Sequence, residues 1–475
     1  MKLEFRPFLV ILALLSVPVV EAQTSSSDSP QNGSTESSPQ DQSSAGPQPV
    51  YTHPQDGPSF GLLDEATSHN FIKLGMGASY AYDTNAAVFS SPKYSQNLGI
   101  LNPSVLLSQT RPTLSWSLGA VGSLTTSSVP GYYTTAGIYG QGNLTWQINH
   151  RWQLIISETY LYTTDPFQQY TAYMGAPSYN QPNPTSYSPL GTTESNAANV
   201  DLSYVIGAHD SITFTGLQNS TSCIYAVYNS TTPSCTSSSS YGSAFNWYTW
   251  GGWAQYQHLF SSRFSAGGGY GFEAVDFGNG TSRSGIQSFQ AFATYQLAPH
   301  MSVTGWIGPQ YISTKNKVPI FCDQFGCFVE IFHNSSWNTA YGGSFAWNGQ
   351  RNAAMINFSK AITNGGVTPA GGFGIVQLYL VRAAYTRQLS PRWSGNLSML
   401  YGNNTSYASV SHYTFDSFTG YAGLVRQLTP TLSASVTYAY FYETTNNRLY
   451  GLLPKWVDNR FQFTLQYYWG HSLGR

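Results

Sequence analysis

Four cysteines are the residues whose type and spacing point most directly to chemistry, and they form two local pairs. Cys223 lies close to Cys235, and Cys322 close to Cys327, each pair within a long polar stretch between two apolar-patterned runs. In an exported protein this placement favours loop-internal disulfides, which restrain the loops. The alternative is metal binding, with His333 near the second pair, but four ligands at zinc spacing are absent. We therefore predict two disulfides, no metal site and no cofactor.

No pattern typical of catalysis accompanies the cysteines. His150, His209, His258 and His300 fall at or beside short turns, and the sequence contains neither a G-x-S-x-G elbow nor an H-E-x-x-H pair. The glycine-rich run 267–271 lacks the Lys-Ser/Thr that completes a phosphate-binding loop. An enzyme with scattered catalytic residues stays open as an alternative, but the sequence predicts that the protein is not an enzyme.

The composition excludes further classes of partner. Charged residues make up only 9% of the chain, and 20 Lys and Arg balance 21 Asp and Glu, whereas about a quarter of a soluble protein is charged. Such a chain has no net attraction to nucleic acid. Aromatic residues are abundant, at 15%. This mixture is expected where only alternate residues need to be apolar.

The last apolar run, Val457 to Gly470, shows this alternation most clearly. A β-strand sends successive side chains to opposite faces, so one face here is apolar and aromatic and the other is polar. About ten residues of such alternation match a tilted strand that crosses a bilayer. The apolar positions are Phe461, Phe463, Leu465, Tyr467 and Trp469.

The same rhythm repeats from Phe71 onward: two alternating runs joined by a short turn, then a longer polar loop. Pro, Asn-Gly and Ser/Thr supply tight-turn chemistry at the short turns. The runs predict about eighteen strands, an even number, as single-chain bacterial barrels require. The strands are expected at 71–83, 103–110, 113–125, 135–148, 152–164, 194–206, 211–219, 244–258, 263–276, 286–297, 301–313, 336–347, 351–362, 376–389, 393–403, 413–428, 431–443 and 457–469.

Alternation also assigns the faces of each strand. Leu114, Trp116 and Leu118 are expected to face lipid, with Ser115 and Ser117 on the other side. Aromatic residues beside the short turns are expected to form an interfacial girdle: Trp146, Trp152, Tyr256, Tyr295, Tyr385 and Trp393.

One strand does not fit the alternation. If Trp152, Leu154 and Ile156 face lipid, Glu158 does so too, and a charge near mid-membrane is unfavourable by up to a few kcal/mol. We expect a β-bulge that turns Glu158 inward.

The inward positions are mostly Ser, Thr, Asn, Gln, Gly and Tyr. The few charged side chains among them either brace the wall by pairing or form a sparse constriction that selects solutes by charge. The tryptophans either stack on sugar rings or pack against an infolded loop. The pore-lining candidates are Lys73, Asp83, Asp201, Trp247, Trp253, Glu273, Trp306 and Arg382.

From about residue 69 to its end the chain resembles Gram-negative outer-membrane β-barrels. The resemblance rests on the alternating strands, on the closing strand and on Tyr80-Ala-Tyr-Asp-Thr-Asn85, which is similar to a Tyr-Asp-x-Asn segment of large porin-like barrels. It departs from the family in that Gly470 to Arg475 follow the last aromatic residue. The resemblance implies insertion by the barrel-assembly machinery into outer-membrane lipid and a porin-like function. Because the arm before the barrel is of low complexity, we expect no plug domain, which argues against siderophore-type transporters.

The expected organisation has three parts. Residues 1–22 read as a cleaved signal peptide, with Lys2 and Arg6 before an apolar core. Residues 23–68, rich in Ser, Gln and Pro, are expected to form a disordered periplasmic arm. Residues 69–475 are expected to form an all-β, antiparallel, up-and-down transmembrane barrel in the outer membrane of a Gram-negative bacterium. A β-propeller is the soluble alternative, but its strands are shorter and buried on both faces.

A ring of sixteen to eighteen strands is wide enough for an aqueous lumen. The sequence therefore predicts a passive channel for small hydrophilic, near-neutral solutes. The long loop from Pro166 to Thr193 is the natural constriction. The alternative is a non-conducting structural or surface-interaction barrel that presents disulfide-tied loops. Assembly into a homo-oligomer stays open, because alternation does not distinguish a subunit contact from a lipid face.

Overall fold

The structure is a computed structural model, and it describes residues 70–84, 95–128, 135–164, 192–225, 246–277, 282–323, 326–364, 375–407, 414–445 and 455–472. All of them belong to the second of the chain's two units, Ser44–Arg475. The expected signal peptide and periplasmic arm lie outside the described residues. No helix in the described ranges is long and apolar enough to cross a membrane.

The described residues form eighteen β-strands, which alternate between short turns and longer connections. Their bounds are β1 Phe71–Asp83, β2 Gln96–Thr110, β3 Leu114–Ser127, β4 Thr135–Gln147, β5 Trp152–Thr163, β6 Thr192–Val205, β7 Asp210–Tyr225, β8 Trp247–Ser261, β9 Phe264–Phe277, β10 Ser282–Ala298, β11 Met301–Asp323, β12 Gly326–Asn348, β13 Asn352–Asn364, β14 Ile375–Ser390, β15 Trp393–Ser406, β16 Thr414–Thr429, β17 Leu432–Thr445 and β18 Lys455–Ser472.

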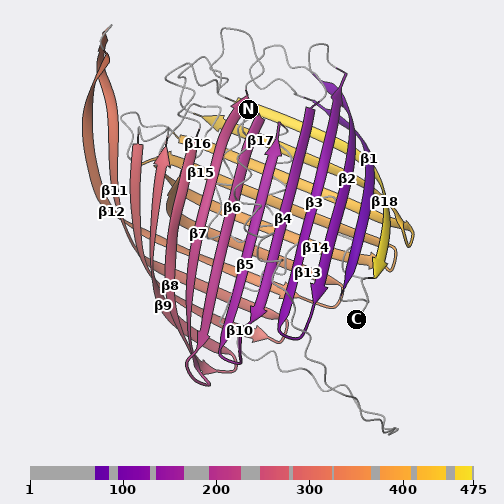
Figure 1. Ribbon diagram of the computed structural model, residues 1–475, viewed down its shortest axis with the longest axis horizontal. Coiled ribbons are helices and arrows are strands. Elements are labelled where there is room, and N and C mark those ends of the chain that lie inside the picture. Colours follow the sequence, from indigo (N-terminus) through magenta and orange to yellow (C-terminus); the bar gives the residue numbers. More distant parts are fainter. Residues whose placement is uncertain are drawn as a thin grey trace, which may run out of the picture. The chain divides into compact units, whose positions relative to one another are not determined.

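The sheet closes on itself as an antiparallel barrel (Figure 1). Each strand pairs with its sequence neighbours, and β1 also pairs with β18 along its full length, from Phe71 opposite Ser472 to Asp83 opposite Arg460. Because β1 and β18 pair, neither the first nor the last strand has a free edge. The absence of a free edge is the condition for a β-sheet to cross a bilayer. The predicted fold class, an antiparallel up-and-down barrel of about eighteen strands, is confirmed.

Strand register divides every strand into two faces, and the exposed large apolar side chains share one of them. In β18, Phe463 and Trp469 are 45% and 51% exposed, whereas Thr464 and Gln466 between them are 5% and 6% exposed. Residues opposite each other in a ladder lie on the same face, so the assignment passes from strand to strand around the ring. We call the face with the exposed apolar residues outer and the opposite face inner.

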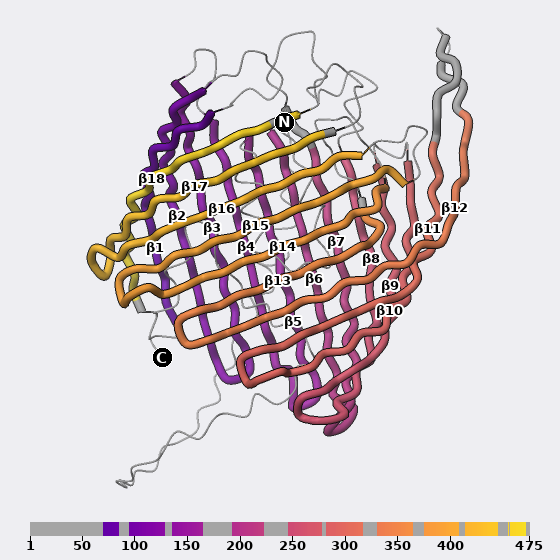
Figure 2. Tube along the Cα trace, turned by 180° about the vertical axis from the view of Figure 1, so that it is seen from behind, coloured from indigo at the N-terminus to yellow at the C-terminus, as the bar shows by residue number. Residues whose placement is uncertain are grey.

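The ladder between β12 and β13 is shorter than its neighbours. It joins only Tyr341–Asn348 to Ala353–Lys360, whereas β11 and β12 pair from Met301 to Asp323. Beyond Tyr341, β12 separates from β13, while β11 stays paired with β10 as far as Asn316. Figures 1 and 2 show that the β11–β12 hairpin projects past the neighbouring strands. The wall therefore has a seam at its long-loop end.

At this seam the wall is double. On the outer face of β13, Phe358 is 51% exposed. Ile362, which lies further along the same face towards the long-loop end, is only 3% exposed. Ile362 packs in a cluster with Ile286 and Ile312, which lie on the inner faces of β10 and β11. The end of β13 thus lies inside the barrel, beneath β10 and β11.

Polar contacts hold the double wall together. The Ile362 N–H donates to Gln310 Oε1 at 2.9 Å, and Gln310 Nε2 donates to Ser288 Oγ at 3.1 Å. Ser336 Oγ of β12 donates to Tyr407 Oη, which follows β15, at 2.8 Å. The β12–β13 ladder ends before Ile362, so β12 offers no acceptor to the Ile362 N–H. The Gln310 side chain supplies the acceptor that this buried N–H requires.

The expected bulge at Glu158 is wrong. The register of β5 runs unbroken against both β4 and β6, with Glu158 opposite Gly142 and Ala198. Glu158 therefore stays on the outer face with Ile156, and Asn196 Nδ2 of β6 donates to its Oε1 at 3.0 Å. A polar neighbour on the same face, instead of a backbone kink, compensates for the charge.

Several strands extend past their predicted bounds. β2 begins at Gln96 instead of residue 103, because Pro103 does not end the strand: its missing N–H falls where the ladder to β3 is interrupted between Leu101 and Ser104. β11 and β12 continue to Asp323 and from Gly326, because they pair with each other beyond the end of the alternating pattern.

Candidate solute pathway on the inner face

The inner face is lined by small polar side chains that bond to one another across the ladders. Ser79 and Thr464 share a hydrogen bond of 2.8 Å between β1 and β18, and Thr294 and Thr304 one of 3.0 Å between β10 and β11. Such pairs arise because serine and threonine recur at the inner positions of adjacent strands. They give the interior a polar, mostly uncharged surface.

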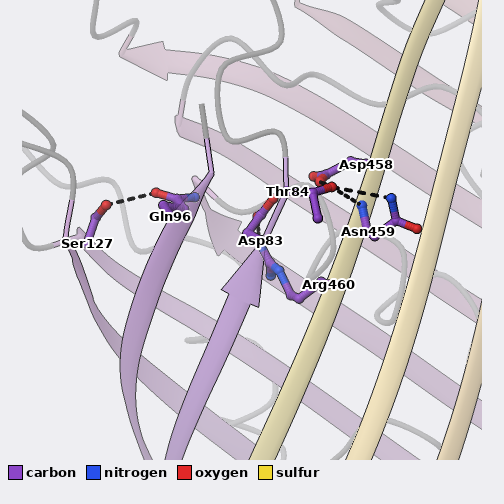
Figure 3. Close-up of polar contacts among 7 residues, drawn as sticks. All are labelled: Asp83, Thr84, Gln96, Ser127, Asp458, Asn459 and Arg460. Atoms are coloured by element: carbon purple, nitrogen blue, oxygen red, sulfur yellow. Dashed lines mark hydrogen bonds and ion pairs between the residues drawn. The ribbon is translucent and has the colours of Figure 1, made fainter. Parts of the chain in front are cut away.

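Among the described residues, a cluster of three charged side chains lies on this surface where the barrel closes (Figure 3). Arg460 Nη2 of β18 lies 2.9 Å from Asp83 Oδ2 of β1. Thr84 Oγ1 donates to Asp458 Oδ1 at 3.3 Å, and the backbone N–H of Asn459 donates to Thr84 Oγ1 at 3.0 Å. The cluster contains two carboxylates and one guanidinium, all buried, and it joins the first and last strands at the long-loop end.

The register places all eight sequence-predicted candidates on the inner face: Lys73, Asp83, Asp201, Trp247, Trp253, Glu273, Trp306 and Arg382. They are spread around the ring and do not form one constellation. Lys73 Nζ lies 4.9 Å from the ring centroid of Tyr468, and Asp201 accepts a hydrogen bond from Thr215. The lining role of the eight residues stays a prediction.

Trp253 and Trp306 lie along the wall above glycines of the neighbouring strand. A Cβ atom on Gly271 would come within 2.3 Å of Trp253 Cδ2, and one on Gly342 within 2.7 Å of Trp306 Cε2. Only a glycine leaves room for the ring at these two places. Both indoles are half-buried, so they brace the wall with one side and keep some ring surface open.

Sequence reasoning missed an apolar layer at the long-loop end of the inner face. Trp247, Val275, Phe277, Ile286 and Ile312 pack together there, each at most 4% exposed. The signal was present in β9, where the inner positions change from glycine to valine and phenylalanine towards the end of the strand. The inner face is thus polar along most of its length and apolar at the long-loop end.

Fully buried polar side chains are also found at this end. Thr249, Asn404 and Thr419 lie on the inner face and are at most 1% exposed. Together with the apolar layer and the end of β13 that lies beneath β10 and β11, they form a closely packed zone at the long-loop end of the inner face. The Pro166 to Thr193 loop, the expected constriction, lies almost entirely outside the described residues.

The predicted disulfides fall on residues whose side chains, or whole placement, are not described. The backbone register of the β11–β12 hairpin does set Cys322 opposite Cys327; the pair Cys223 and Cys235 is not covered. Among the described residues, no group of three or more His, Cys, Asp or Glu side chains could hold a metal ion. Both disulfides stay predictions.

The chain is similar to several crystal structures of barrels. It resembles OpdO of Pseudomonas aeruginosa, with 12% identity and a TM-score of 0.39 over 84% of this chain and 97% of that chain. It resembles OccAB4 of Acinetobacter baumannii, with 9% identity and a TM-score of 0.40 over 85% and 99%. The ferric-catecholate import receptor Fiu of E. coli K12 is similar at 9% identity and a TM-score of 0.40, over 83% and 81%. No family model and no curated protein sequence matches the chain.

The architecture is that of the Gram-negative outer-membrane β-barrels. The closed ring of eighteen antiparallel strands confirms the resemblance predicted from the sequence.

Proposed function

We propose that the protein is an outer-membrane channel through which small hydrophilic solutes diffuse passively. The observation that carries this proposal is the segregation of the two faces around a closed ring. The outer face carries exposed apolar side chains, whereas the inner face carries hydroxyl and amide groups, such as the pairs Ser79–Thr464 and Thr294–Thr304. A barrel of this strand number is wide enough to leave an aqueous path unless it is filled.

Near-neutral solutes fit the inner surface best. Its charged groups are few, and in the principal cluster Arg460 pairs with Asp83 and also interacts with Asp458, which offsets one of the two carboxylates. A weakly charged wall gives little electrostatic selection. The half-buried rings of Trp253 and Trp306 add flat surfaces on which sugars could stack, so small uncharged carbohydrates are the solute class that we favour.

The proposed location follows from the same features. We infer that the protein resides in the outer membrane of a Gram-negative bacterium, after export by a cleaved signal peptide and insertion by the barrel-assembly machinery. The short turns would then face the periplasm and the long loops the exterior, as is usual for these barrels.

Conductance of the purified protein in a planar bilayer tests the channel. Discrete single-channel steps with weak cation or anion preference are expected. Swelling of proteoliposomes in uncharged sugars of increasing size would then give the size limit. A tight membrane, despite insertion verified by protease protection, would contradict the proposal.

One observation favours a second function. The apolar layer and the buried polar side chains at the long-loop end are arranged as in a packed core, as the 0–3% exposure of Val275, Phe277 and Thr249 illustrates. The alternative is therefore a non-conducting barrel that presents its disulfide-tied loops to a partner. It predicts that the reconstituted protein stays closed at all voltages and that binding to the partner depends on the loops.

A further inference from the structure

Arginine is concentrated at one end of the barrel. We define the short-turn rim as the short turns together with the four strand residues on either side of each. The rim carries seven of the arginines in the described residues: Arg111, Arg151, Arg263, Arg351, Arg387, Arg392 and Arg426. In the described chain Asp210 is its only carboxylate, and His258 Nδ1 lies 2.8 Å from that carboxylate.

The guanidinium groups of the rim are available to a partner outside the chain. All seven arginines are exposed. Within the described residues none of them forms an ion pair, whereas Arg283 and Arg460, at the opposite end, are paired with Asp276 and Asp83. Seven arginines against one carboxylate on the same rim, counted over the described residues, create a local positive potential.

The direction of two of these side chains identifies the surroundings of the rim. Arg387 of β14 and Arg426 of β16 both lie on the outer face. The Arg426 guanidinium carbon lies 5.2 Å from the ring centroid of Trp393, which belongs to the aromatic girdle. Such rings mark the depth of lipid headgroups. The two arginines therefore point sideways into the headgroup layer, away from the lumen.

We propose that the short-turn rim binds the phosphates of anionic phospholipids in the leaflet on that side of the membrane. The planar guanidinium fork matches a phosphate oxygen pair, and arginine is weakly enough hydrated to bind it at an interface. A lipid such as phosphatidylglycerol, whose phosphate is not neutralised by its own ammonium group, is favoured over a zwitterionic one. The inference rests on membrane insertion and does not depend on conduction.

Brominated lipids test the proposal, because bromine quenches tryptophan emission on contact, and Trp146, Trp152 and Trp393 belong to the rim. The full protein is reconstituted in phosphatidylcholine vesicles containing brominated phosphatidylglycerol or, in parallel, brominated phosphatidylcholine. Each engaged arginine is expected to favour the anionic lipid by up to about fivefold at low salt, and high salt should reduce the preference.

A variant and a matched control make the test specific. The rim variant combines Arg387→Gln, Arg392→Gln and Arg426→Gln. Its preference for the anionic over the zwitterionic lipid should fall by a factor of about three or more. The control combines Arg283→Gln, Lys360→Gln and Lys455→Gln, three cations at the opposite end, and it should keep the preference. Heat-modifiable migration in gels verifies that both variants are folded.

Four results would overturn the proposal. They are equal quenching by both lipids, an unchanged preference in the rim variant, an equal loss in the control, and stronger quenching by brominated lipid A than by phosphatidylglycerol. Displacement of the anionic lipid by a soluble, carboxylate-rich cell-wall peptide would instead assign the rim to a polymer outside the bilayer, and it would also contradict the lipid. Conductance of the same vesicles reports on the channel separately.

Discussion

Arg460 and Asp83 join the two ends of the barrel chain through a buried ion pair of 2.9 Å. Because Asp458 also interacts with both groups, the two members of the pair are not equivalent. Removing the guanidinium leaves two buried carboxylates together, whereas removing the Asp83 charge leaves Arg460 with Asp458.

We therefore expect Arg460→Gln to lower the free energy of unfolding by about 3–5 kcal/mol, the range for breaking a buried pair, and Asp83→Asn to lower it by less. Urea unfolding in vesicles, followed by tryptophan emission, measures both. Arg283→Gln, which breaks an exposed pair with Asp276, should change stability by about 1 kcal/mol or less. An Asp83→Asn barrel less stable than the Arg460→Gln barrel would contradict this order.

Glu158→Gln is expected to stabilise the protein in the membrane. The substitution removes a charge from the outer face, where Arg or Lys is unfavourable by about 2–4 kcal/mol at mid-membrane and acidic residues by less, so a gain of about 1 kcal/mol is expected. The new amide oxygen still accepts the bond from Asn196. Glu194→Gln, closer to the long-loop end, should have a smaller effect. Equal unfolding curves for Glu158→Gln and the parent protein would show that Glu158 lies outside the hydrocarbon.

Phe277→Ala should increase single-channel conductance, because Phe277 belongs to the apolar layer at the long-loop end, where we expect the interior to be narrowest. The loss of a buried phenyl ring should also lower stability by about 3–5 kcal/mol, so insertion is checked first. Phe289→Ala, on the outer face, is the matched control and should leave conductance unchanged. If Phe277→Ala conducts like the parent protein, the narrowest point lies elsewhere.

Gln310→Leu should weaken the seam. It removes the acceptor of the buried Ile362 N–H, and an unsatisfied buried donor is unfavourable by about 1–3 kcal/mol. Hydrogen exchange at Ile362 should become faster, while exchange in the β16–β17 ladder stays slow. Gln287→Leu, on the outer face of β10, serves as the control. Unchanged exchange at Ile362 would mean that another acceptor replaces the side chain.

Cys322 and Cys327 should be linked in the exported protein, because the hairpin register places them opposite each other. Peptide mass mapping without reduction should recover the two cysteines in one linked peptide, and thiol alkylation should label neither. Labelling of both residues in folded protein prepared under oxidising conditions would exclude the bond.

The strands and their faces could be predicted because both depend on a local period of two. β1 was expected at 71–83 and lies at Phe71–Asp83. The inner placement of Asp201, Glu273 and Arg382 followed from the same alternation. Strand positions and faces can be predicted without knowing that β12 and β13 separate at the long-loop end.

The double wall could not be predicted, because it is a tertiary arrangement without a local signature. Ile362 and Phe358 are both apolar residues on the same face of β13, yet one is buried and the other exposed. The difference arises because the β12–β13 ladder ends at Tyr341. The length of a ladder depends on both strands and cannot be predicted from the sequence of either one alone. The prediction of a bulge at Glu158 was wrong for a related reason. The penalty for the charge can be read from the strand itself, but its hydrogen-bond partner Asn196 lies 38 residues away.

The short β12–β13 ladder also sets the mechanical behaviour of the ring. Under tension a closed cylinder parts where the fewest bonds act side by side, and here that line is not the junction between the chain's first and last strands. Pulled from opposite sides, the barrel would unroll into an open sheet whose borders are β12 and β13, while β1 and β18 remain joined in its middle.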